Sequence, residues 1–177
     1  MAGAPYKVRG DYKVGDIFEV RLQGNKKGYL QYIGKDATQI GSDVVRVFEK
    51  RYTTEANPAI EDIVSDKIEF YTHVVSAEFG MQDDSWVRVG NSNNIGDLKT
   101  AFFRDPGDQP VRKENGLYGL PNVSKTWYLW RMNEPRVFVK ELTGENTKAY
   151  SGDATWPKNI VYRMQTGKYH AFYPDYK

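Results

Sequence analysis

Two pairs of aspartates are the side chains best placed to do chemistry in this chain: Asp83 with Asp84, and Asp105 with Asp108. Two carboxylates held at a fixed separation can act as acid and base, as they do in glycosidases. Both pairs, however, lie in segments rich in turn-forming residues, where carboxylates are commonly solvated. Loops on a rigid scaffold often carry binding residues. We therefore predict that these four aspartates contact a binding partner and expect no catalytic activity, while a hydrolase that uses a carboxylate pair stays open as a further alternative.

Other catalytic and cofactor chemistry lacks its usual sequence patterns. The chain has no cysteine, which excludes disulfides, thiolate catalysis and cysteine-bound zinc. Its two histidines, His73 and His170, form no metal-binding pair such as HExxH, and neither a GxSxG elbow nor a phosphate-binding GxxxxGK(S/T) loop occurs. We predict no metal or other cofactor. We assign both histidines surface or hydrogen-bonded roles, with His73 on the polar face of its strand beside Glu69.

The elements that must position these residues begin with three strands joined by glycine-containing turns. Residues 17–22 alternate apolar and charged side chains, which is typical of a half-buried strand. We predict two further strands at residues 29–33 and 44–48, with turns at 24–28 and 34–36, where glycine permits a positive φ. Three strands connected in this way favour an antiparallel meander, and many small β-barrels begin with one.

The remaining chain alternates strands with short helices. The patterns predict strands at residues 67–76, 86–90, 102–103 (an edge strand), 126–132 and 136–142. Helices are predicted at residues 58–64 and 157–167, the second with Gly167 as its C-cap. Residues 81–84 read as a turn, and residues 105–123 as a long ordered loop of a kind that is often functional.

These elements predict a mainly β (α+β) fold. We expect a curled antiparallel sheet or small barrel with one or two short helices, the clearest near the C-terminus. At 177 residues, with 40% hydrophobic and 14% aromatic content, the chain is long and apolar enough to bury a core. We predict a single domain over residues 1–177, in which residues 1–14 form an N-terminal arm.

Charge and hydropathy narrow the choice of partners. The net charge of +2, from 25 basic and 23 acidic residues, is too balanced for the phosphate neutralisation that drives non-specific nucleic-acid binding. No apolar run is long enough to span a membrane, and the first residues lack the apolar core of a signal peptide. We predict a cytoplasmic protein with no membrane partner.

One aromatic segment keeps an alternative open. Residues 127–130, Trp-Tyr-Leu-Trp, place rings on both faces of a predicted strand. Burial of both faces is the simpler interpretation because aromatic side chains dominate cores. An exposed face would instead be a platform for a protein, a sugar or a single-stranded nucleic acid. The alternative is therefore a β-barrel binding module for nucleic acid or carbohydrate, with an exposed basic or aromatic stripe around Arg131, Arg136 and Lys140.

A pattern of glycines and hydrophobic residues carries the leading functional prediction. It comprises GDIFEV at residues 15–20, GYLQYI at 28–33, SDVVRVF at 42–48, Phe70-Tyr71 followed by WVRVGN at 86–91, and the helix at 157–167. This pattern resembles the bacterial immunity protein 26 family, which is carried in polymorphic toxin gene clusters. The resemblance implies a protein that binds a cognate toxin domain in the cytoplasm and blocks it, with no cofactor and no catalysis. The matching residues look structural, which leaves partner binding to the loops.

Overall fold

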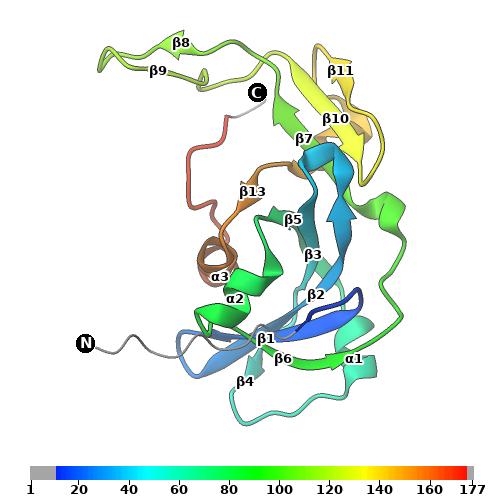
Figure 1. The fold of residues 1–177 in the computed structure, drawn as a ribbon. Coiled ribbons are helices and arrows are strands. Elements are labelled where there is room, and N and C mark those ends of the chain that lie inside the picture. The colour runs from blue at the N-terminus through cyan, green and yellow to red at the C-terminus, as the bar shows by residue number, and fades with distance from the viewer. Residues whose placement is uncertain (1–10, 175–177) are drawn as a thin grey trace, which may run out of the picture.

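Two β-sheets and a separate hairpin make up most of the computed structural model, which describes residues 11–174 (Figure 1). The large sheet has the strand order β13 (Ala154–Thr155), β5 (Ile68–Val74), β3 (Ser42–Phe48), β2 (Lys26–Asp36), β1 (Asp16–Leu22) and β6 (Trp86–Asn91), with β4 (Tyr52–Thr53) also paired to β2. The small sheet has the order β11 (Val137–Val139), β10 (Trp127–Arg131), β7 (Phe102–Pro106) and β12 (Tyr150–Ser151). The hairpin pairs β8 (Val111–Arg112) with β9 (Tyr118–Gly119).

Both faces of the large sheet are buried, and the alternation in β1 explains how. Phe18 and Val20 pack on one face, beneath α2 (Ala77–Gln82) and α3 (Pro157–Thr166), whereas Ile17 packs on the other face with α1 (Ile60–Val64). A third cluster, which includes Phe103 and Trp130, fills the space between the two sheets. The central strands therefore hold the helices and the small sheet in place, because each of their faces contributes to a core.

The mainly β, α+β prediction is confirmed, but the sheet is not a closed barrel. Over residues 11–174, the large sheet begins at β13 and ends at β6, and these two strands do not pair. The sheet is also mixed, because β13 runs parallel to β5, and β12 runs parallel to β7 in the small sheet. The expected meander is present as β1, β2 and β3, which pair antiparallel in sequence order.

Three local predictions were wrong, each for an identifiable reason. The turn at residues 34–36 is instead the end of β2, because Gly34 takes a φ of +142° at a register shift and lets the strand bend and continue. The edge strand at 102–103 is β7, which lies between β10 and β12. The first half of the predicted turn at 81–84 is instead the end of a helix, α2, whose N-cap Ser76 accepts a hydrogen bond from the backbone of Glu78 at 3.2 Å; only residues 83–84 form a turn.

The C-terminal helix is confirmed closely. α3 starts with Pro157 in its first turn and ends at Gly167, which takes a φ of +70° and whose N–H donates to the carbonyl of Arg163 at 2.8 Å. Proline at the start and glycine just past the end is the arrangement that helix termini favour. Ile160 and Met164 are buried against the large sheet. No helix among residues 11–174 is long and apolar enough to cross a lipid bilayer.

Of the predicted N-terminal arm, residues 1–10 lie outside the described part of the chain. The remainder packs on the large sheet. The Tyr12 ring meets that of Tyr32 edge-on at 5.1 Å, and its hydroxyl donates to Asp43 at 2.6 Å. Residues 11–14 thus continue the fold.

A buried aspartate joins the two sheets. Asp36, at the end of β2, accepts hydrogen bonds from Trp130 Nε1 of β10 at 2.9 Å and from His73 Nε2 of β5 at 2.8 Å. Its other oxygen accepts from the backbone N–H groups of Asn133 at 2.9 Å and Thr38 at 3.0 Å. The side chains of Asp36 and His73 are both 0% exposed, so the predicted place of His73 on a polar face was wrong. We refer to Asp36 with these four donors as the seam.

Candidate functional site

The predicted partner-binding aspartates fall in two separate places. Asp83 and Asp84 form the exposed turn between α2 and β6, where Asp83 accepts a hydrogen bond from the backbone of Ser85 at 3.0 Å. Asp84 takes a φ of +58° there. Asp105 lies instead in β7 of the small sheet, and Asp108 lies at the start of the hairpin that emerges from this sheet. The four aspartates therefore do not form one acidic site, and their contact with a partner stays a prediction.

Asp108 closes the base of the hairpin. Its carboxylate accepts hydrogen bonds from the hydroxyl of Ser124 and from the backbone N–H groups of Lys125 at 2.9 Å and Thr126 at 3.2 Å. These bonds outweigh desolvation and lower the pKa of Asp108. Beside it, the N–H of Gly107 donates to the carbonyl of Thr126 at 2.8 Å. The carboxylate thus fixes the two ends of the hairpin together.

The hairpin itself extends away from both sheets (Figure 1). We call residues 107–126 the projecting hairpin. At its tip the N–H of Lys113 donates to the carbonyl of Leu117 at 2.7 Å, and Gly116 takes a φ of +80°. Leu117 is 68% exposed and Tyr118 74% exposed. Val111 and Val123 are exposed as well. This segment, predicted as an ordered functional loop, therefore presents several large apolar side chains to solvent.

The aromatic strand is largely buried. Trp127, Leu129 and Trp130 of β10 are buried, and only Tyr128 is exposed, where its ring meets that of Phe138 at 5.4 Å. The prediction that this strand is buried on both faces is thus confirmed for three of its four residues, Trp127, Leu129 and Trp130.

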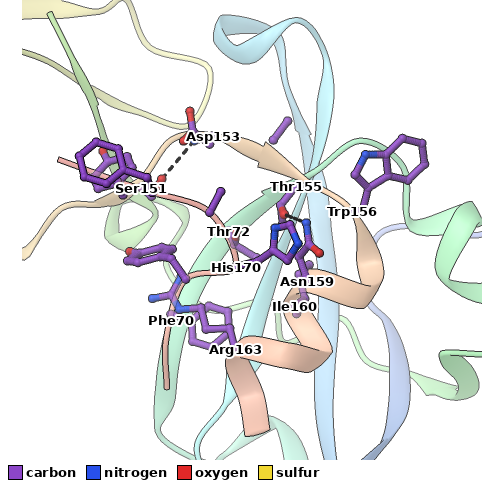
Figure 2. Close-up of a pocket in the computed structure, with 15 residues that line it drawn as sticks. Phe70, Thr72, Ser151, Asp153, Thr155, Trp156, Asn159, Ile160, Arg163 and His170 are labelled. Carbon is purple, nitrogen blue, oxygen red and sulfur yellow. Dashed lines mark hydrogen bonds between the residues drawn. The ribbon is translucent and has the colours of Figure 1, made fainter. Parts of the chain in front are cut away.

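A second candidate site is a cavity of about 320 Å³ beside α3 (Figure 2). It lies between the end of β5, residues 151–156, α3 and the C-terminal segment, by which we mean residues 169–173. Its lining mixes rings with hydrogen-bonding side chains, including Phe70, Thr72, Asn159, Arg163, Tyr169 and His170. The volume lies at the lower end of the range typical of small-molecule sites, roughly 300–1,000 Å³.

Arg163 is the cation of this cavity. Its guanidinium carbon lies 3.7 Å from the centre of the Phe70 ring, beside which Figure 2 shows it, and 4.4 Å from the centre of the Tyr169 ring. Burial lowers the pKa of Arg163, although nearby Tyr169 and Glu69 oppose the change. Within residues 11–174 Arg163 forms no ion pair, and Glu69, whose charge acts on it, pairs with Arg51. Glu69 and His73, which were predicted to share a strand face, thus bond to different partners, Arg51 and Asp36.

Asp105 and Asp153 form an electrostatically linked pair near the seam. Burial, and then the charge of Asp153, raises the pKa of Asp105 to about 7, although Arg136 at 3.3 Å acts in the opposite direction. Burial also raises the pKa of Asp153. Oδ1 of Asp105 is buried without a hydrogen-bond partner. At neutral pH these two carboxyl groups therefore hold less negative charge than two free aspartates would.

Sequence reasoning missed Asn159, Arg163 and Asp153 as site residues. One signal was present, because Asn159 and Arg163 are four residues apart in the predicted helix and so lie on one face of it. Asp153 lies between two-residue strands whose parallel pairing has no local sequence signature. In comparisons with known proteins, no protein-family model, no curated protein and no solved structure matches this chain.

Proposed function

We propose that this chain is an immunity protein that binds and neutralises a cognate bacterial toxin in the cytoplasm, and that the projecting hairpin is its main contact surface. One observation carries the proposal. The hairpin stands away from the body of the fold and leaves Leu117 68% and Tyr118 74% exposed, whereas most large side chains of the two sheets are buried. Exposed apolar side chains gathered on one element are a feature of protein-binding surfaces.

The physical argument concerns the stability of the hairpin. A two-stranded hairpin without a covering layer is marginally stable in water. Each strand here has only two paired residues, so the clamp by Asp108 supplies much of its order. Docking on a partner would bury Leu117 and Tyr118, and tyrosine is enriched among the residues that contribute most to interfaces. Docking would thus cover two apolar side chains that the fold itself leaves exposed.

The choice of a toxin as the partner rests on the resemblance to the immunity protein 26 family. The three segments that carry most of it are the central strands β1, β2 and β3. These strands form a scaffold, and Asp36 at the end of β2 binds Trp130 of β10 and the backbone of Asn133, which fixes the small sheet and its hairpin to that scaffold. A scaffold of this kind with one protruding element is consistent with a protein inhibitor that acts by occupying a surface of its target.

No specific observation favours the alternative of a nucleic-acid module. The guanidinium of Arg131 lies over the Phe102 ring at 4.4 Å, and that of Arg136 lies over Trp130 at 4.4 Å while also contacting Asp105. Two of the three cations that such a stripe requires are thus held against the protein's own side chains.

The test uses the product of the gene next to this one as the candidate toxin. Tagged wild-type protein should capture that product in a one-to-one complex, and its co-expression should rescue the growth of cells that make the toxin. Replacing both Leu117 and Tyr118 with alanine should raise the dissociation constant by roughly 100-fold, since a loss of about 1.4 kcal/mol at each of the two residues gives that factor. The matched control replaces Val87 and Val89, two exposed residues of the edge strand β6.

Absence of both capture and rescue by the wild-type protein would overturn the toxin proposal. Capture that the hairpin variant leaves unchanged, but that the β6 variant weakens, would place the interface elsewhere. Thermal unfolding of each variant serves as the folding control, because all four side chains are exposed and their removal should leave the melting temperature close to that of the wild type.

A further inference from the structure

The cavity beside α3 holds a positive charge, Arg163, that forms no ion pair within residues 11–174, although Asp153 also lines the cavity and the charge of Glu69 acts on Arg163. Arg163 is half-buried, its guanidinium carbon lies over the rings of Phe70 and Tyr169, and no carboxylate among residues 11–174 forms an ion pair with it. Cations removed from water are normally paired, because an uncompensated charge is costly to bury. Ring contacts recover only part of that cost.

The cavity also has room for an organic group next to this charge. A cavity of roughly 150 Å³ is enough for benzene, and this one measures about 320 Å³. Phe70, Ile160 and Phe172 supply apolar wall, while Thr72 and Asn159 supply hydrogen-bonding groups. The amide nitrogen of Asn159 donates to the Thr155 hydroxyl at 3.0 Å, so the amide is held in one orientation.

We propose that this cavity binds a small organic anion, whose carboxylate or phosphate group pairs with Arg163 and whose apolar body packs against the surrounding rings. Guanidinium groups bind planar and tetrahedral oxyanions through two parallel N–H donors, and Arg163 is the arginine that lines this cavity. The depressed pKa of Arg163, caused by burial, is consistent with a cation that lacks a counter-ion. Pairing with an anion would remove this penalty.

The anion site is independent of the toxin proposal. It uses α3, β5 and the C-terminal segment, whereas the toxin proposal uses the tip of the projecting hairpin. Either proposal can fail without the other. The C-terminal segment lies between them, since Phe172 lines the cavity and is also 5.3 Å from the ammonium group of Lys113 in the hairpin.

The experiment compares three probes that share one aromatic body. These are 3-phenylpropionate, phenyl phosphate and the neutral 3-phenylpropionamide, and inorganic phosphate serves as the probe without a body. Binding to the full-length protein is followed by ligand-detected NMR and by titration of the protein's amide resonances. At least one of the two aromatic anions should bind, and the neutral amide should bind about 10- to 100-fold more weakly, which is the loss expected for a charge-assisted pair. The two anions distinguish a carboxylate site from a phosphate site.

Two substitutions of Arg163 test whether its positive charge binds the anion, and a third substitution on α3 is the control. Arg163→Gln should bind the anion and the amide equally weakly, whereas Arg163→Lys keeps the positive charge and should retain part of the preference for the anion. Lys158→Gln removes one cation from the same helix outside the cavity lining, and it should bind like the wild type. The shifted amide resonances should belong to α3 and residues 151–156.

Three results would overturn the proposal. One is a failure of all four probes to bind wild-type protein at millimolar concentrations. Another is equal binding of the anions and the amide, which needs no variant to observe. The third is an Arg163→Gln protein that folds and still prefers the anions, because Arg163 would then serve only to hold Tyr169 of the C-terminal segment in place.

Discussion

Replacing Asp36 with asparagine tests how strongly the seam joins the two sheets. The substitution keeps the shape of the side chain but removes its charge and turns one acceptor oxygen into an amide donor. Asp36 accepts from four donors: Trp130 Nε1 and His73 Nε2 on one oxygen, and two backbone N–H groups on the other. Whichever oxygen is replaced, at least one of these donors would then face the N–H₂ group of the asparagine. All of this happens where Asp36 is fully buried and water cannot compensate.

The magnitude follows from the pKa of Asp36. Burial alone would raise it, but hydrogen bonds from His73, Asn133, Trp130 and Thr38 outweigh burial and lower it from 3.8 to about 2. At about 1.4 kcal/mol per pKa unit, the ionised form is favoured by roughly 2.5 kcal/mol. Loss of one partner of a buried charged pair costs about 3–5 kcal/mol. We therefore expect Asp36→Asn to lower the free energy of unfolding by about 3 kcal/mol.

The assay is urea unfolding followed by tryptophan fluorescence, together with thermal unfolding. For a chain of this size, about 3 kcal/mol corresponds to a fall in melting temperature of roughly 6–12 °C. The pH dependence gives a second check. Because the folded-state pKa lies below the unfolded one, the stabilisation is present above about pH 4 and is lost as the pH falls toward 2, and Asp36→Asn should not show this loss.

Asp62→Asn is the matched control, because Asp62 is exposed on α1 and its substitution should change stability by less than about 0.5 kcal/mol. An Asp36→Asn protein that unfolds at the same urea concentration as this control would refute the reasoning, since the two sheets would then be held together by apolar packing alone.

Three further substitutions probe the surroundings of the seam and the end of α3. Gly152→Ala should cost about 1–3 kcal/mol in thermal unfolding, because the new Cβ would lie 2.0 Å from Cη2 of the buried Trp130. The raised pKa of Asp105, about 7, means that its contribution to stability is present below about pH 4 and is lost as the pH rises toward 7. Asp105→Asn removes this loss. In urea unfolding, the free energy of unfolding of the variant relative to the wild type should therefore rise by roughly 2–3 kcal/mol between pH 5 and pH 8, and a difference that does not change with pH would contradict the assignment. Gly167→Ala should cost only about 1 kcal/mol, since its φ is +70° but no atom lies within 4 Å of the added Cβ; a loss of several kcal/mol would mean that the C-cap also positions the C-terminal segment.

Local sequence patterns predicted the elements whose stability is mainly local. The alternation in β1, the β-branched residues of β3 and the proline–glycine ends of α3 each reflect a preference of neighbouring residues. The same reasoning failed at Gly34, because a glycine that bends a strand and a glycine that ends one have the same sequence signature. It also placed β7 at an edge, since the partner on its far side, β12, is a two-residue parallel strand more than forty residues away.

The environment of charged residues could not be predicted from the sequence at all. His73 and Asp36 are 37 residues apart, and the polar neighbours of His73 in its own strand suggested exposure rather than complete burial. Asp105 was singled out as one of four turn carboxylates, yet its properties depend on Asp153 and Arg136, which come from different parts of the chain. Pairing between distant segments follows from packing, which no local pattern reports.

The seam gives the projecting hairpin a fixed direction, and this bears on how such a hairpin could bind tightly. β7 and β10, which flank the hairpin in the chain, are tied to the large sheet through Trp130 and Asp36, and Asp108 then locks the two ends of the hairpin to each other. From the other side, Tyr173 of the C-terminal segment donates its hydroxyl proton to the carbonyl of Arg104 in β7 at 2.7 Å. Ordering a loop on association costs binding free energy, and an element that is already ordered avoids part of that cost. If the projecting hairpin is the contact surface proposed above, polar contacts far from Leu117 and Tyr118 would therefore contribute to the affinity of those two exposed side chains.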